Sequence, residues 1–527
     1  MPTITIDGQA VQAQAGQMIL QAALDAGIDL PHYCYHPGLS IVASCRICLA
    51  EVEGVPKLLP TCQTPVREGM VVRTRSPRSV ANQKQVMEYL LINHPLDCPV
   101  CDQSGECYLQ DYSYQYGRSV SRFEEDKLKK PKKIVGERVL LYNDRCIMCT
   151  RCVRFTREVS GGAELMVQGR GHREEIDIFP GRPLDNQLSL NVVDLCPVGA
   201  LLDRDFLFKQ RVWLLKSARS ISPVDAGGEN IYLQYNEGVI HRIKPRYNPD
   251  VNQWWISDDT RYSYKAVHAE DRLRTAATRR HGLLEPAGFD EALEAAWAGL
   301  GEAAGKGRLF AVLSPMMACE EAWLLGKLIR ELDAEATLVL GPVPAGEDEV
   351  FRHYETRAET FRISGEKVPN RRGIERVMEM LGGPRMTWDQ FTAADRGRFA
   401  GGWAVGGYLG DWTGGEAPPA VREGFTVVQD ILPNAFAEAA SVVLPAAAWA
   451  EKDGCWENLD NRVQPFESAI EPPPGVRREG EVYAKLLGRT DGYLAAQVRE
   501  EMGGPFADVR FEHAGDEAAS PFEFAEL

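Results

Sequence analysis

Cysteines with the spacing of metal ligands gather in the first 196 residues of this 527-residue chain. Eleven of its thirteen cysteines lie between Cys34 and Cys196, in closely spaced groups. A disulfide framework explains them poorly, because the cysteine total is odd, the gaps are short and no secretory leader is visible. Thiolate ligation of metal explains the spacing better. Together with His94 the cysteines make twelve candidate ligands, or three sets of four.

The first set has the pattern C-x10-C-x2-C-x13-C and consists of Cys34, Cys45, Cys48 and Cys62. Plant-type ferredoxins bind a [2Fe-2S] cluster through C-x4-C-x2-C and a distant fourth cysteine. The first gap is longer here, but the close pair and the remote fourth cysteine are kept. The pattern predicts a [2Fe-2S] cluster, with a structural zinc ion as the alternative.

The second set lies in the stretch HPLDCPVCDQSGEC and consists of His94, Cys98, Cys101 and Cys107. A histidine immediately before three spaced cysteines favours metal ligation over an ordinary polar role. Four ligands from so short a segment suit a tetrahedral zinc ion and a [4Fe-4S] cluster equally well. The spacing of this set alone therefore leaves both open.

The third set combines RCIMCTRC with DLCPVGAL and consists of Cys146, Cys149, Cys152 and Cys196. A C-x2-C-x2-C triplet with a fourth cysteine before proline is typical of a bacterial-ferredoxin [4Fe-4S] cluster, whereas zinc sites more often use separated pairs. Thr156 stands where a two-cluster ferredoxin would have its next cysteine, so one cluster is predicted. With clusters predicted on both sides of it, the second set is best interpreted as a [4Fe-4S] site with one neutral imidazole.

The elements that must position these ligands can be predicted from pattern. An Asp7-Gly8 turn predicts a β-hairpin in a compact α+β unit, and helical spacing ends near Gly27. A second helix is predicted over residues 79–93, because Pro95 disfavours helical geometry just before it. His94 should then lie at the exit of that helix.

The C-terminal half has a different pattern. LFAVLSP, CEEAWLLGKLIREL and ATLVLGP alternate strand, helix and strand, as in a parallel α/β layer. Cys319 and Cys455 stand singly and are interpreted as packed residues. The last forty or so residues, rich in proline, glycine and acids, are predicted to be irregular.

Composition and missing motifs exclude several functions. A net charge of −16 argues against nucleic-acid binding. No signal peptide and no apolar run of roughly 20 residues is visible, so we expect a soluble, intracellular protein that reaches a membrane only through partners. The sequence has no Walker A motif, no dinucleotide-binding glycine spacing and no nucleophile-and-base motif. Electrons should pass through this chain while substrates bind elsewhere.

The order of these motifs strongly resembles the large iron-sulfur subunit of respiratory complex I, the bacterial NADH:quinone oxidoreductase. The resemblance continues through WISDDTRYSY and VVLPAAAWAEKDG. It implies one [2Fe-2S] and two [4Fe-4S] clusters on the three sets, no catalytic residue, and no FMN, NAD or molybdopterin on this chain. It also implies electron transfer from a flavin-containing, NADH-oxidising subunit, through other peripheral-arm subunits, toward a quinone-reducing membrane arm. The implied location is the cytoplasmic face of the bacterial inner membrane.

The resemblance also implies a multidomain α+β and α/β fold. Its parts would be a [2Fe-2S] ferredoxin-like β-grasp domain (1–78), a one-histidine, three-cysteine [4Fe-4S] segment (79–118), a [4Fe-4S] ferredoxin-like domain (137–214), a cysteine-free remnant of a 4Fe-4S molybdopterin-oxidoreductase-type domain (215–271), and a shortened molybdopterin-oxidoreductase-like domain without cofactor (272–527). Some bacterial relatives carry a further cluster in the fourth part. Here the comparable positions are Ser222, Asp225, Glu229 and Ser257, and no cysteine lies between 197 and 318.

Two alternative functions are weighed against this one. The chain could be the electron-input subunit of a soluble NAD-linked hydrogenase or formate dehydrogenase, whose N-terminal regions share the three-cluster arrangement. Their catalytic subunits need further cysteines in the C-terminal half, where only Cys319 and Cys455 stand. The other alternative is a zinc-stabilised scaffold without a redox role.

Overall fold

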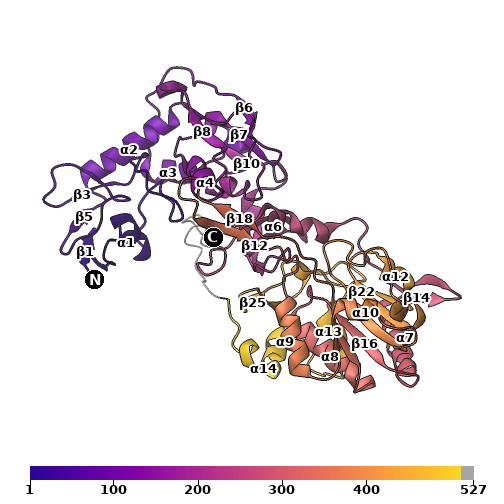
Figure 1. The fold of residues 1–527 in the computed structure, drawn as a ribbon. Helices are drawn as coiled ribbons and strands as arrows, with labels where there is room; N and C mark the ends of the chain where they lie inside the picture. The colour runs from indigo at the N-terminus through magenta and orange to yellow at the C-terminus, as the bar shows by residue number, and fades with distance from the viewer. Residues whose placement is uncertain (512–527) are drawn as a thin grey trace. The chain divides into compact units, whose positions relative to one another are not determined.

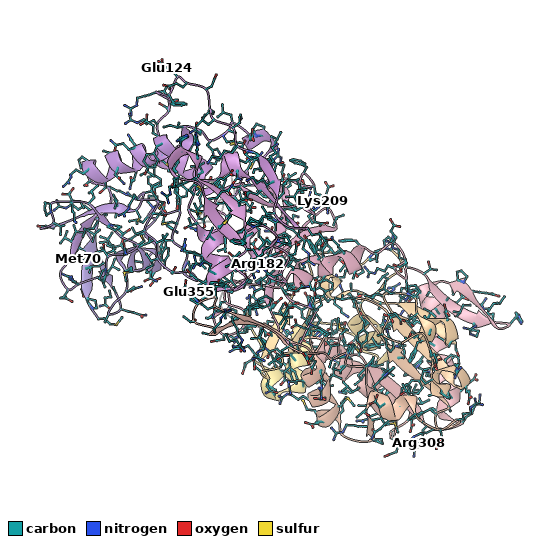
Figure 2. The ribbon with its side chains drawn as sticks, turned by 45° about the horizontal axis from the view of Figure 1, so that its top comes forward. Met70, Glu124, Arg182, Lys209, Arg308 and Glu355 are labelled. Carbon is teal, nitrogen blue, oxygen red and sulfur yellow. The ribbon has the colours of Figure 1, made fainter. Side chains whose placement is uncertain are left out.

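The computed structural model describes residues 1–511, which fall into two compact units (Figure 1). Among the described residues, the first unit comprises Met1–Leu215 together with Val350–Phe361, and the second comprises Lys216–Glu349 and residues 362–511. Figure 2 labels Met70 and Glu124 in the first unit and Arg308 in the second. No helix within residues 1–511 is both long and apolar enough to cross a bilayer.

A mixed five-stranded sheet with one helix forms the start of the first unit. Asp7 and Gly8 have φ angles of 50° and 91°, which the tight hairpin turn requires and the sequence predicts. Helix α1 (Ile19–Asp25) buries Ile19 and Ala23 against the sheet. The strands, in pairing order, are β2 (Gln9–Gln12), β1 (Thr3–Ile6), β5 (Val71–Arg73), β3 (Leu49–Val52) and β4 (Leu59–Pro60).

Two helices flank the second ligand set. Helix α2 (Pro77–Leu91) begins after Ser76, whose hydroxyl accepts a hydrogen bond from the Ser79 N–H at 3.2 Å. It ends at Leu91, close to the predicted boundary, so His94 follows its exit. Helix α3 (Tyr108–Tyr116) begins immediately after Cys107.

The remainder of the first unit holds the third ligand set. Helix α4 (Arg151–Glu158) contains Cys152, and α5 (Asn191–Leu195) ends immediately before Cys196. Two small antiparallel sheets support them. Their strands are β10 (Leu201–Asp203), β7 (Val139–Tyr142) and β6 (Lys132–Ile134) in one, and β8 (Leu165–Gln168) and β9 (Glu175–Ile178) in the other.

A hairpin from much later in the chain completes the first unit. It is formed by β18 (Glu349–Arg352) and β19 (Glu359–Ile363), and residues 350–361 cluster with the N-terminal residues. The Tyr354 N–H donates to the Arg157 carbonyl at 2.7 Å, and the Thr360 hydroxyl donates to the Val159 carbonyl at 2.6 Å.

The second unit begins with a three-stranded antiparallel sheet, followed by the short helix α6 (Asp258–Tyr262). Ile231, Leu233 and Ile243 from this sheet contribute to a buried apolar cluster. Its strands are β11 (Lys216–Ile221), β12 (Asn230–Asn236) and β13 (Val239–Pro245).

An eight-stranded sheet is the core of the second unit. Its parallel strands run outward in both directions from β16, which is the doubly wound order of nucleotide-binding α/β folds. The predicted strand, helix and strand over LFAVLSP to ATLVLGP are confirmed. In pairing order the strands are β15 (Leu283–Ala287), β14 (Ala276–Arg280), β23 (Val442–Pro445), β22 (Phe425–Asp430), β21 (Gly401–Val405), β16 (Leu309–Leu313), β17 (Thr337–Leu340) and β20 (Arg385–Met386).

Helices cover both faces of this sheet (Figure 1). Leu309, Ala311 and Leu313 of β16 join one core, and the alternate residues Phe310 and Val312 join the other. The first core includes residues of α7 (Phe289–Ala304), α8 (Cys319–Leu332), α9 (Arg371–Leu381), α13 (Glu479–Leu486) and α14 (Ala495–Met502). The second includes residues of α10 (Trp388–Thr392), α11 (Pro419–Glu423) and α12 (Ala435–Ala439).

The prediction of an irregular C-terminal stretch is wrong for α14. Val498 and Met502 lie one helical turn apart and are buried in the first core, so tertiary packing stabilises a helix of otherwise polar sequence. The prediction for residues 512–527 lies outside the described residues.

Candidate iron-sulfur sites

Antiparallel pairing of β3 with β4 assembles part of the first set. Leu49 opposes Pro60 in the register, so Cys48 and Cys62, at the adjoining ends of these strands, come together. The Thr61 hydroxyl donates a 2.9 Å hydrogen bond to the Cys48 carbonyl and fixes this end of the pair.

The thiols of the first set contact one another. Hydrogen bonds with Cys45 and Cys62 lower the pKa of Cys34, and hydrogen bonds with Cys34 and Cys48 raise the pKa of Cys62. All four predicted ligands therefore gather in one place. The loop before β3 bends sharply, with φ of 60° at Arg46, as a short ligand-bearing loop requires.

The second set follows the exit of α2 and ends at the start of α3. Burial lowers the pKa of His94 to about 4, and the nearby positive charge of Arg145 contributes to the same shift. The imidazole is therefore neutral near pH 7, which is the form that binds metal. Burial raises the pKa of Cys107 to about 12, whereas Cys98 is exposed.

A glycine leaves room for a sulfur of the second set. A Cβ added at Gly199 would lie 2.2 Å from the Cys101 Sγ, so any larger side chain would displace that thiol. Gly199 follows Cys196 of the third set in DLCPVGAL. The Tyr108 N–H also donates to the Pro197 carbonyl at 3.1 Å, so the second and third sets share local backbone contacts.

The third set lines a single apolar cavity. Cys146, Cys149, Cys152 and Cys196 all face it, together with Ile147 and Val198. The loop between the first two cysteines is tightly wound, with φ of 54° at Met148, whose N–H donates to the Cys146 Sγ at 3.4 Å. An apolar cavity lined by four thiols, with an amide donor to one of the sulfurs, suits a [4Fe-4S] cluster.

Burial holds the third-set thiols in their protonated form without metal. It raises the pKa of Cys146 to about 12 and that of Cys149 to about 11, and it raises that of Cys152 well above the ordinary thiol range. Because cluster binding requires thiolates, loading this cavity would release protons.

Within residues 1–511, no three ligand-type side chains converge closely enough to hold one metal ion. The four ligands of an iron-sulfur cluster are shared among two or four irons, so they lie around the cluster rather than at one common metal ion.

A buried oxygen network occupies the cysteine-free segment 215–265. The Ser257 N–H donates to the Glu229 carboxylate at 2.9 Å, and the hydroxyls of Ser257 and Thr260 also donate to Glu229. The hydroxyls of Ser222 and Thr260 lie 2.6 Å apart. Asp225 is 1% exposed, and its Oδ2 has no hydrogen-bond partner among residues 1–511. Oxygen donors without a thiolate do not fit a [4Fe-4S] cluster.

Cys319 and Cys455 meet in the second unit, which no sequence pattern indicates. Both thiols are fully buried, and a hydrogen bond joins them between the start of α8 and β24 (Gly454–Glu457). Their packed character is as predicted. Their pairing depends on contacts between distant segments, for which the sequence holds no local signal.

Family models match five segments of the chain. Residues 1–77 match a 2Fe-2S iron-sulfur cluster binding domain, and residues 83–122 match the NADH-ubiquinone oxidoreductase-G iron-sulfur binding region. Residues 136–202 match the ferredoxin-like domain of NADH-quinone oxidoreductase subunit 3, and residues 215–265 match the NDSU1/NuoG-like 4Fe-4S domain of NADH-ubiquinone oxidoreductase. Residues 419–489 match a molybdopterin oxidoreductase domain.

Curated relatives agree with these matches. The NADH-ubiquinone oxidoreductase 78 kDa subunit of Neurospora crassa is 46% identical over 292 residues, 55% of this chain and 39% of that protein. An NADH-quinone oxidoreductase subunit of Rickettsia bellii is 41% identical over 295 residues, 56% of this chain and 43% of that protein. The iron-sulfur half of this chain is therefore similar to subunits of NADH-ubiquinone and NADH-quinone oxidoreductases.

These relatives favour the complex I interpretation over the hydrogenase or formate dehydrogenase alternative. The NADH-ubiquinone oxidoreductase 75 kDa subunit of Reclinomonas americana is 39% identical over 344 residues, 65% of this chain and 50% of that protein. The chain thus spans at most about half the length of these three relatives. A chain in a crystal structure of NAD⁺-reducing [NiFe]-hydrogenase is 30% identical, with a TM-score of 0.37, over 40% of this chain and 91% of that one.

The family matches confirm the multidomain architecture expected from the sequence. A 2Fe-2S domain and 4Fe-4S domains precede a molybdopterin-oxidoreductase-type region. The twelve ligand assignments and the exact domain boundaries stay predictions.

Proposed function

We propose that this chain is the electron-transfer subunit of the peripheral arm of NADH:quinone oxidoreductase. It relays electrons from a flavin-containing, NADH-oxidising subunit through iron-sulfur clusters toward quinone. The observation that carries this proposal is the gathering of all four third-set cysteines around one buried cavity, in a chain whose relatives are subunits of NADH-quinone and NADH-ubiquinone oxidoreductases.

Three clusters follow from the donor sets of the first unit. The first set would bind a [2Fe-2S] cluster, and the second and third sets would each bind a [4Fe-4S] cluster. The clusters supply one-electron chemistry when bound. The chain's own residues anchor them, exclude water and set the charge around them.

Segment 215–265 carries no cluster in this proposal. The nearest cysteines in the sequence lie at 196 and 319, so the segment offers only oxygen donors at its centre. The Glu229 carboxylate accepts hydrogen bonds from Ser257 and Thr260 there. The Ser222 hydroxyl lies within hydrogen-bond distance of the Thr260 hydroxyl.

The second unit holds no molybdopterin in this proposal. In doubly wound sheets, ligands bind outside the carboxyl ends of the strands where strand order reverses, which here lies between β16 and β21. Tyr408, which follows β21, is 6% exposed, and its ring stacks on that of Trp412 with the ring centroids 5.3 Å apart. Its hydroxyl donates a hydrogen bond to the Pro342 carbonyl at 2.6 Å. Met316, after β16, is also buried. The burial of these two side chains at the edge where a ligand would bind supports this part of the proposal.

The proposed partners are the flavin-containing subunit and the other peripheral-arm subunits, with the quinone-reducing membrane arm reached indirectly. These partners would attach the chain to the cytoplasmic face of a bacterial inner membrane.

The test is anaerobic purification of the chain together with its NADH-oxidising partner. We expect roughly ten irons per chain, broad visible absorption and electron paramagnetic resonance (EPR) signals that NADH elicits. Molybdenum should be absent. Colourless material that contains zinc would instead support the scaffold alternative. Iron-containing material without NADH-reducible signals would refute the complex I assignment.

A further inference from the structure

Helix α4 presents one polar stripe to the loop that carries the first set. Arg151, Arg154 and Glu158 recur at i, i+3 and i+7, so they share one face of the helix. The carboxylate of Glu158 accepts from both the N–H, at 2.8 Å, and the hydroxyl of Ser40. The same helix contains Cys152 of the third set.

Arg154 contacts the backbone of both cluster-binding loops. Its Nη2 donates to the Cys34 carbonyl of the first set and, at 3.4 Å, to the Cys149 carbonyl of the third set. Its Nη1 donates to the Ser40 carbonyl. The side chain is 8% exposed, so these bonds lie away from solvent. Because the guanidinium is planar and rigid, its hydrogen bonds hold the two loops in a fixed position relative to each other.

Arg151 also links the first and third sets through hydrogen bonds to the backbone. Its Nη2 donates to the Tyr35 carbonyl at 2.5 Å, and its Nη1 donates to the Leu195 carbonyl at 3.3 Å. Tyr35 follows Cys34 and Leu195 precedes Cys196. Arg151 is 5% exposed. Two buried positive charges thus lie between the first and third sites.

Buried cations at this position have an electrostatic consequence. Reduction adds negative charge to a cluster, and a nearby guanidinium stabilises that charge strongly where water is excluded. Lysine would keep the charge but lose the forked hydrogen bonds to two carbonyls.

We propose that Arg151 and Arg154 are positioning residues that hold the first and third sites at a fixed separation and raise the midpoint potential of both. This inference rests on the proposed function, because it requires clusters at both sites.

The test compares Arg154→Gln and Arg154→Lys in the complex assembled with its partners. Arg157→Gln is the matched control, because Arg157 lies on the same helix but makes an exposed ion pair with Glu355 at 2.9 Å. Redox-titrated EPR measures both midpoints, and spin-relaxation enhancement measures the interaction between the clusters.

With full iron content, Arg154→Gln should lower both midpoints and change the interaction between the clusters. Arg154→Lys should keep both midpoints near their wild-type values, because the charge is retained, but it should still change the interaction between the clusters. Arg157→Gln should match the wild type in both measurements. Unchanged midpoints in Arg154→Gln, or equal shifts in the control, would overturn the proposal. If Arg154→Gln loses iron, Arg151→Lys is tested in its place: an altered interaction supports the proposal and an unchanged one refutes it. A wild type without iron would refute the proposed function instead.

Discussion

Gly199 and Cys101 lie so close together that a Cβ on the glycine would stand 2.2 Å from the cysteine sulfur. No unusual backbone conformation requires glycine at this position, since its φ is not positive. Space for the sulfur is the constraint.

Gly199→Ala should therefore displace Cys101 and impair the second site. We expect loss of up to roughly four irons per chain and a destabilisation of about 1–3 kcal/mol from overpacking. Iron assay and denaturant unfolding measure the two effects. Gly301→Ala in α7 is the control, because no neighbouring atom in the described part of the chain lies within 4 Å of its added Cβ. Full iron content in Gly199→Ala would contradict the steric argument.

His94→Cys should retain a cluster at the second site and lower its midpoint potential. A thiolate adds one negative charge to the ligand set, which disfavours a further electron. The low pKa of His94, about 4, makes the wild-type ligand neutral at physiological pH. Redox-titrated EPR tests this, and a midpoint that stays or rises would refute the charge argument.

Stability of the second unit should fall as pH rises from about 5 to 8. Burial raises the pKa of Glu229 from 4.5 to about 8 and that of Asp225 from 3.8 to about 6. The folded state therefore binds protons more tightly than the unfolded state in this window, and the stabilisation present at low pH is lost as these carboxyls ionise.

Glu229→Gln should remove much of this pH dependence, because the amide stays neutral. The free energy of unfolding, measured with denaturant at pH 5.5, 7 and 8.5, should change by a few kcal/mol in the wild type and by less in the variant. Glu347→Gln, at an exposed position, is the control. An equal slope in wild type and Glu229→Gln would contradict the assignment of the pH dependence to Glu229.

Lys452→Met should destabilise the second unit by about 3–5 kcal/mol. Lys452 lies 2.9 Å from both Glu321 and Glu479, and all three side chains are buried, so its removal leaves two carboxylates without a cation. Arg280→Met, which breaks an exposed pair with Glu291, should cost under about 1 kcal/mol. Denaturant unfolding measures both, and equal losses would refute the role of burial.

The sequence predicted what depends on local spacing. Cys146, Cys149 and Cys152 lie within one short segment, so their ligand geometry is largely encoded there. The α8 helix and the flanking strands follow from hydrophobic periodicity over a few turns.

Contacts between segments that are distant in the sequence could not be predicted from such local patterns. The contact of Arg154 with Cys34, the meeting of Cys319 with Cys455 and the burial of Glu229 each join segments that have no shared local signal. The α14 helix was missed because its buried face depends on a partner helix rather than on its own propensity.

The β18–β19 hairpin has a practical consequence for dividing the protein. A fragment that stopped at Leu215 would lack residues 350–361, and the carbonyls of Arg157 and Val159 would lose the donors that Tyr354 and Thr360 supply. Anyone expressing the iron-sulfur portion alone should graft these twelve residues onto it or add them as a separate peptide.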